Sequence, residues 1–306
     1  MKSKNLKKIL KTFTIATFAI VCLVILPGMS SAKQPGPPFS FPGGKRGQDA
    51  INALQGRLPE VASLYGKNAD KLKKNLLHDE DLWLDSTEKL LYLCSFDISE
   101  ADVPPEPAES AIPQGPFPYS QTFQLHSLAG ASKIIYLDFD GHTTSGTIWN
   151  NNFNGGADIV SIPYDINGDT GSFSDAELGR IQNIWARVAE DFAMYNIDVT
   201  TEDPGVEALR RSSSGDEQYG IRVVISPTSS WYGSAGGVAY VGSFDWNSDT
   251  PTFVFSNKLG NGNEKYVTDA ASHETGHTLG LSHDGLSGGT AYYQGHGSWA
   301  PIMGVG

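Results

Sequence analysis

The sequence contains only two cysteines and no internal repeat. Each of these features argues against a class of protein. Its 306 residues include two cysteines, Cys22 and Cys94. Cys22 lies in an apolar stretch near the N-terminus that we expect to be removed, so the mature chain would keep only Cys94 and could form no intramolecular disulfide. A protein stabilised by disulfides is thereby excluded, and the absence of a repeat argues against a solenoid or propeller.

Basic residues are also scarce outside the N-terminus. The first 32 residues hold five lysines and no acid, whereas the remainder carries 17 basic against 34 acidic residues, a net charge of −17. So acidic a chain is not expected to bind nucleic acid or an anionic membrane. It fits a soluble secreted protein, for which calcium could be a second ion beside any catalytic metal.

Residues 1–32 have the pattern of a secretory signal peptide. The five lysines precede an apolar stretch from Thr12 to Leu26, and the small residues Ser30, Ser31 and Ala32 suit cleavage after Ala32. An uncleaved membrane anchor is the alternative, although the stretch is short for one. We therefore expect a secreted protein with no stable membrane association after cleavage.

Residues 33–102 are expected to form a small α+β segment, separate from the rest of the chain. Apolar residues recur at helical spacing between Ile51 and Leu64, and residues 81–85 and 90–94 predict two short strands around a turn. Residues 103–118 are proline-rich and lack periodicity, which indicates an exposed linker within residues 103–125. Residues 126–306 would then be the main domain, with residues 33–102 as its propeptide.

The most informative motif is HETGHTLGLSHDG, which spans residues 273–285. His273 and His277 lie one helical turn apart, so both imidazoles can bind one zinc ion at about 2.0–2.1 Å. Glu274 is placed to take a proton from a water molecule at that ion. Gly280 permits the positive φ of a sharp turn, which would return His283 as the third ligand and leave the fourth position open for chemistry.

This motif resembles the HExxHxxGxxH signature of the metzincin zinc metalloproteases, and Asp284 after the third histidine resembles their reprolysin (adamalysin) branch. Met303 falls where these proteins have a methionine-containing turn beneath the metal, and Gly280, Asp284 and Met303 would be structural residues of the site. The segment GGVAYVGSF, residues 236–244, is similar to the edge strand that pairs with substrate in reprolysins. That similarity assigns Val238, Ala239, Tyr240 and Val241 to substrate binding.

The resemblance implies an α+β fold with a mixed, twisted sheet, a long backing helix and an active-site helix. KIIYLDF from Lys133, IDVTTED and IRVVIS indicate strands. Ser174 and Glu177 match a capping box at the start of a long amphipathic helix, and the active-site helix should begin near Glu264. Because the sequence ends three residues after Met303, the C-terminal subdomain of the family is expected to be truncated.

Cys94 could keep such an enzyme latent. A propeptide thiolate is a good zinc ligand and could occupy the fourth position until the propeptide is removed. The alternative is a small buried hydrophobe, because YLCSF lacks the flanking residues usual for such a switch. Replacing Cys94 with serine should release activity in the unprocessed chain if the thiolate hypothesis holds.

Two weaker candidate sites remain open. Asp165, Asn167 and Asp169 have the alternating oxygens of a calcium loop but lack EF-hand register, and a turn before Ser174 is the preferred interpretation. His296 could contact substrate or could be structural.

The predicted function is therefore a secreted zinc endopeptidase with one catalytic Zn²⁺ and a protein or peptide substrate. Two alternatives remain. One is a secreted zinc amidase that acts on a non-protein amide, and the other is a catalytically silent, zinc-containing binding or adhesion protein. The glutamate of the motif argues against the silent protein, and an edge strand able to pair with an extended backbone favours a peptide substrate.

Overall fold

The computed structural model describes residues 44–96, 115–233, 235–285, 293, 295, 296 and 299–304. All of them belong to one compact unit, Phe39–Gly306. The predicted signal peptide and residues 97–114 lie outside the described residues. Residues 115–125, which the sequence assigned to an exposed linker, instead pack on the main part of the chain, since Thr122 and Leu125 are buried and Phe117 N–H donates to Gln182 Oε1. Among the residues that are described, no helix combines the length and apolar character needed to cross a bilayer.

The N-terminal segment contains three helices and a hairpin. Helices α1 (Gly47–Leu54) and α2 (Leu58–Leu64) confirm the predicted helical pattern, with a 3₁₀ turn, η1 (Gln55–Arg57), between them. Pro59 explains the break, because proline fits the first turn of a helix but not its interior. Helix α3 (Ala69–His78) was not anticipated, and the strands β1 (Leu82–Leu84) and β2 (Leu90–Cys94) fall where the sequence predicts them.

The main part of the chain begins with η3 (Tyr119–Gln121) and the buried strand β3 (Lys133–Asp138). A small hairpin of β4 (His142–Thr144) and β5 (Ile159–Ser161) encloses the short helix α4 (Ile148–Phe153). Helix α5 (Asp175–Asp191) comes next, and its N-terminus is the predicted capping box: the Ser174 and Glu177 side chains each accept a hydrogen bond from the other's backbone N–H.

The second half of this part supplies the remaining strands and the active-site helix. These elements are β6 (Ile197–Thr200), α6 (Val206–Leu209), β7 (Tyr219–Ser226), β8 (Gly237–Tyr240), η4 (Ser243–Asp245), β9 (Thr252–Phe255), η5 (Ser256–Lys258) and α7 (Glu264–Thr278). Helix α7 starts at the predicted residue. Strand β9 was not predicted from the sequence.

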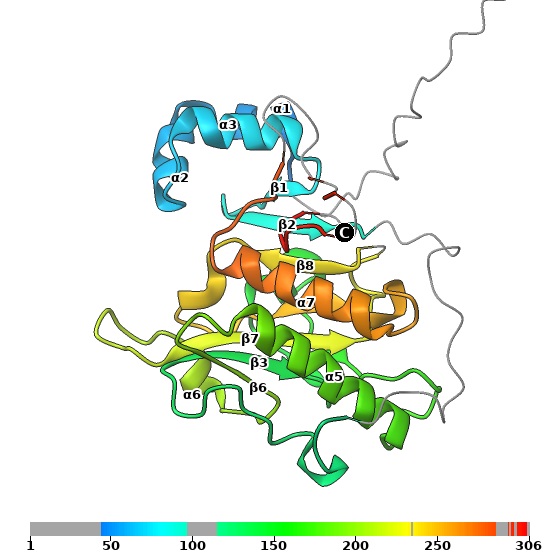
Figure 1. Cartoon of the computed structure of the whole chain (residues 1–306). Helices are drawn as coiled ribbons and strands as arrows, with labels where there is room; N and C mark the ends of the chain where they lie inside the picture. The colour runs from blue at the N-terminus through cyan, green and yellow to red at the C-terminus, as the bar shows by residue number, and fades with distance from the viewer. Residues whose placement is uncertain are drawn as a thin grey trace, which may run out of the picture. The chain divides into compact units, whose positions relative to one another are not determined.

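Seven strands form one mixed sheet in the order β1-β2-β8-β9-β7-β3-β6. Strands β9, β7, β3 and β6 are parallel, whereas β8, β2 and β1 pair antiparallel with their neighbours. Helices α5 and α7 lie side by side on one face (Figure 1). The α+β fold with its mixed sheet, backing helix and active-site helix is therefore as expected.

The sheet departs from expectation at one edge. The strand around Tyr240 was predicted to be the edge strand, but in the structure it is covered by β2 from the N-terminal segment. Four residue pairs join them, from Leu91 opposite Tyr240 to Cys94 opposite Gly237. The hairpin β1–β2 thus extends the sheet beyond the strand expected to end it.

Candidate metal centre

Helix α7 brings the first two histidines together. Its N-terminus is capped by Asn263, whose side chain accepts a hydrogen bond from Lys265 N–H. Further along the helix, His273 and His277 share one face, with their Nε2 atoms 3.0 Å apart. Both imidazoles are almost completely buried. The helix therefore presents two metal donors in a site closed to bulk water.

The turn after α7 returns the third histidine to the site. Gly280 has φ +90°, a conformation that strongly favours glycine. Gly280 N–H donates to His277 O and Leu281 N–H donates to Gly276 O, which together form a Schellman motif. The chain then reverses, and His283 faces the two helical histidines. Gly280 has the structural role that the sequence assigned to it.

Met303 packs against helix α7 next to Gly276. It is buried, and a methyl group on Gly276, between the two helical histidines, would overlap its sulfur. The preceding carbonyl, Ile302 O, lies 2.7 Å from His273 Nδ1, and Asp284 N–H donates to Met303 O. Met303 and Asp284 therefore join the C-terminal turn to the ligand-bearing segment.

Cys94 completes a set of four donors. Its sulfur lies 3.4 Å from His277 Nε2, 3.5 Å from His273 Nε2 and 3.6 Å from His283 Nε2. A tetrahedral zinc ion with ordinary bond lengths needs sulfur–nitrogen separations of about 3.6 Å and nitrogen–nitrogen separations of about 3.3 Å. The structure thus brings Cys94 to the three histidines, an arrangement the sequence offered only as one of two alternatives.

The tautomers of the histidines agree with metal binding. His273 Nδ1 faces Ile302 O and His277 Nδ1 lies 3.0 Å from Leu281 O. Because a carbonyl can only accept, each Nδ1 carries the proton and each Nε2 directs a lone pair at the centre. Burial and the neighbouring His283 lower the pKa of His273 to about 3, and burial lowers the pKa of His277 well below its ordinary value. Neutral imidazoles are the form that binds a metal.

Two buried acids, Cys94 and Glu274, lie at the centre beside the three histidines. Burial raises the pKa of the Cys94 thiol well above its ordinary value, and the Glu274 and Asp81 carboxylates add to this. Burial likewise raises the pKa of Glu274, whose side chain interacts with the Cys94 thiol. A bound metal ion would instead lower the pKa of the Cys94 thiol, because a thiol that coordinates a metal loses its proton. His273, His277, His283 and Cys94 would hold the ion, with Glu274 beside it.

The predicted substrate strand runs directly past Glu274. A side chain on Gly237 would overlap the Glu274 carboxylate, so glycine permits this close approach. Val238, Ala239 and Tyr240 lie in β8 and pair with β2, and Val241 N–H donates to Leu90 O. The four residues assigned to substrate binding are therefore covered by the N-terminal segment.

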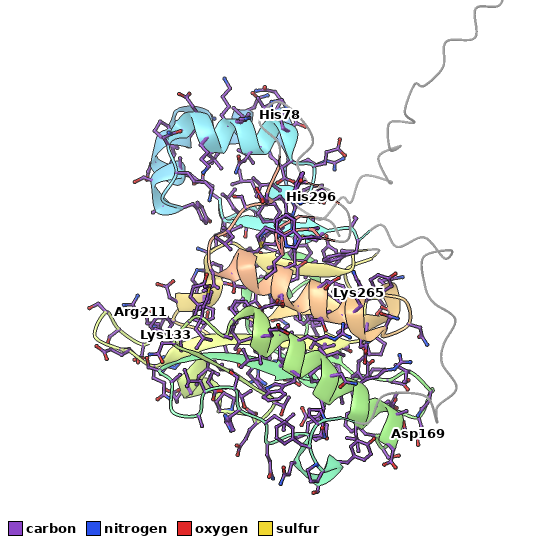
Figure 2. All side chains as sticks on the ribbon, in the orientation of Figure 1. His78, Lys133, Asp169, Arg211, Lys265 and His296 are labelled. Atoms are coloured by element: carbon purple, nitrogen blue, oxygen red, sulfur yellow. The ribbon has the colours of Figure 1, made fainter. Side chains whose placement is uncertain are left out.

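The weaker candidate sites do not join this centre. Asp165, Asn167 and Asp169 accept hydrogen bonds from backbone N–H groups two or three residues ahead, which supports a turn before α5. Asp169 lies beyond the N-terminal end of that helix (Figure 2). His296 is 2.9 Å from the Tyr293 hydroxyl and forms a bridge with Trp299. Calcium binding gains no support from the described residues.

Sequence reasoning missed two residues of the site, Asp79 and Tyr92. Both oxygens of the buried Asp79 carboxylate lie 3.0 Å from His283 Nδ1. The Tyr92 ring stacks on His277 at 3.8 Å between centroids. Asp79 is 204 positions from its partner, and nothing in the local pattern marks it. Tyr92 could have been inferred from Cys94, because alternate residues of a strand share a face.

Three histidines, a neighbouring glutamate and a mixed sheet with a helix that carries two of the histidines are the features expected of a zinc metallopeptidase. Residues 188–284 match the Metallo-peptidase family M12B Reprolysin-like, which confirms the resemblance to the reprolysin-like metzincins. The match includes β8 and all three histidines and supports zinc-dependent peptidase activity. No curated protein and no solved structure matches the chain.

Proposed function

We propose that this protein is a secreted zinc endopeptidase whose N-terminal segment keeps it latent. The observation that carries the proposal is the convergence of the Cys94 thiol with His273, His277 and His283, next to the buried Glu274. Four such donors form a closed zinc site, whereas the three histidines alone form a site with one open position. Coordination by the Cys94 thiol would therefore close the site in the latent state, and its loss would open the fourth position in the active state.

The catalytic roles follow from the positions of the groups. A bound zinc ion would polarise the scissile carbonyl and make water at the site more acidic. Glu274 takes the proton from that water and passes it to the leaving amine. The backbone of β8 holds the substrate as an added antiparallel strand, and Gly237 allows it to lie close to Glu274.

The path of β2 favours endopeptidase activity. The strand pairs with β8 from Leu91 to Cys94, and the chain continues past the centre to Phe96, whose ring contacts that of His273. An extended chain thus lies across the centre with residues on both sides of it. A site that accommodates polypeptide on both sides of the centre suits cleavage within a chain rather than at its end. The backbone pairing favours a peptide substrate over another amide.

Secretion is proposed from the sequence alone. The signal-like residues 1–32, the acidic remainder and the single cysteine that persists after processing all agree with an extracellular enzyme. Residues 33–102 are proposed as the propeptide, residues 103–125 as the linker where cleavage separates it, and residues 126–306 as the catalytic domain.

The test uses a chain with a recognition site for a sequence-specific protease inserted in the predicted linker. After cleavage and separation of the N-terminal segment, a mixed set of quenched peptides should be hydrolysed, and Glu274→Ala or a zinc chelator should abolish hydrolysis. The uncleaved chain should be nearly inactive. Cleaved protein that binds one zinc per chain yet hydrolyses no peptide would contradict the proposal and favour the amidase or the silent binding protein.

A further inference from the structure

The third histidine differs from the other two in the group that orients it. The Nδ1 atoms of His273 and His277 face backbone carbonyls, Ile302 O and Leu281 O, which lie in the same part of the chain as the histidines. His283 Nδ1 instead faces the carboxylate of Asp79, at the C-terminal end of α3 in the N-terminal segment. The carboxylate of Asp79, from the N-terminal segment, is thus within hydrogen-bond distance of one of the three histidines.

Asp79 is itself held in place. It is buried, with 6% of its surface exposed. The Tyr92 hydroxyl donates to Oδ2 at 3.1 Å, and Asp81 N–H donates to Oδ1 at 3.3 Å. A buried carboxylate with these donors has one defined orientation, and that orientation directs it at His283. Carboxylate partners of this kind fix the ring of a metal-binding histidine and increase its basicity.

The same segment also holds the turn that carries His283. Lys67 Nζ donates to Gly280 O at 3.4 Å, and Asn75 Nδ2 donates to Ser282 Oγ at 3.2 Å. His283 lies five residues beyond the end of α7, so the helix does not fix its position directly. Contacts from α3 and the loop before it therefore contribute to the placement of the third ligand.

We propose that the N-terminal segment assembles the metal centre as well as covering it: Asp79 is a positioning residue for His283, and the chain binds zinc most tightly while this segment is attached. The inference rests on the proposed zinc function and deepens it. It assigns to the segment two separate effects, a fourth ligand from Cys94 and the orientation of the third ligand by Asp79.

The experiment measures zinc affinity of the uncleaved full chain by competition with a chromogenic chelator. Asp79→Asn removes the charge and one of the two acceptor oxygens, and Asp79→Ala removes both oxygens. We expect a loss of affinity of about 10- to 100-fold, at least as large for alanine as for asparagine. Asp70→Asn, in the same helix, is the matched control and should bind zinc as the wild type does.

A double-mutant comparison separates positioning from general damage. In a His283→Ala background, Asp79→Asn should cause no further loss of zinc affinity, because its target imidazole is absent. Tyr92→Phe removes one donor to Asp79 and should weaken binding in the same direction but less, which keeps the test available if Asp79 variants fold poorly.

Two results would overturn the inference: zinc affinity within twofold of wild type in Asp79→Ala, or equal losses from Asp79→Asn with and without His283. Failure of the proposed zinc site is distinguishable, because the wild-type chain would then bind no zinc or would be unaffected by His273→Ala. Failure of the proposed peptidase activity would show in the hydrolysis of quenched peptides and would leave these zinc affinities unchanged. If His273→Ala abolishes binding while Asp79→Ala does not weaken it, only the positioning role is lost.

Discussion

Replacing Cys94 with serine should relieve latency only in part, because two contacts keep the N-terminal segment in place. One is the thiol at the metal centre. The other is the β2–β8 pairing, in which Leu91 and Leu93 are buried in an apolar cluster with Val238, Tyr240 and Phe253. The serine variant loses the first contact and keeps the second.

The free energy that the β2–β8 contact contributes can be estimated from the burial of its two leucines. Leu91 and Leu93 are 0% and 2% exposed, and complete burial of a leucine contributes about 2 kcal/mol. The hairpin also packs on α1–α3 through a second cluster, to which the main part of the chain adds Val241, so the segment should leave as one unit rather than unfold. Roughly 4 kcal/mol then opposes opening, which leaves about one chain in a thousand open.

The assay is the initial rate of quenched-peptide hydrolysis by uncleaved protein, with mass spectrometry to show that the chain stays intact. Cys94→Ser should be more active than wild type but at about 1% or less of the cleaved enzyme. Adding Leu93→Ala should raise that activity tenfold or more, since such a truncation costs about 2–5 kcal/mol. Ser95→Ala is the matched control and should remain latent. If intact Cys94→Ser is as active as the cleaved enzyme, the strand does not contribute to latency.

Three further predictions concern Glu274, the contact between Gly276 and Met303, and the partly buried His142. Glu274→Ala in the cleaved enzyme should bind zinc normally but lose about 10²- to 10⁴-fold in turnover, and hydrolysis at the wild-type rate would remove Glu274 from the mechanism. Gly276→Ala should destabilise the fold by about 1–3 kcal/mol through overlap with Met303, with partial recovery in Gly276→Ala/Met303→Ala; an unchanged melting temperature would contradict this contact. Burial, with Arg222, lowers the pKa of His142 to about 4, so between pH 6.5 and 4 the unfolded chain gains a proton that the folded chain does not. The contribution of His142 to the free energy of unfolding should fall by up to about 3 kcal/mol over that window. Burial raises the pKa of the neighbouring Asp138 to about 7, which acts in the opposite sense, so the test is the difference between wild type and His142→Asn in denaturant titration.

The parts of the fold that could be predicted from sequence are those encoded by local chemistry. The capping box of α5 and the start of α7 follow from side chains three or fewer positions apart, and both are confirmed. Gly280 was located because the motif fixes its spacing from the histidines, and Met303 because the family that the motif resembles has a methionine-containing turn after the third histidine. The two strands of the hairpin were found because each is a short apolar run next to a turn.

Other features depend on contacts between distant segments, which local patterns do not encode. Strand β9 is a short apolar run with no alternation, and helix α3 has only two buried leucines among many lysines. The pairing of β2 with β8 joins residues more than 140 positions apart. Asp79 is an ordinary acidic residue in sequence, and only the folded chain shows that it faces a metal ligand.

The register of β2 on β8 explains why a cysteine at position 94 reaches the metal centre. Cys94 pairs with Gly237, and Gly237 is the residue of β8 that lies against Glu274. A strand that extends the sheet through Gly237 must therefore pass over the Glu274 carboxylate. Because side chains of a strand alternate between faces, Leu90, Tyr92 and Cys94 share one side and Leu91 and Leu93 the other. A slip of one residue would direct Leu93 at the histidines and turn the thiol away, so the burial of both leucines on the opposite face is what directs the sulfur to the three imidazoles.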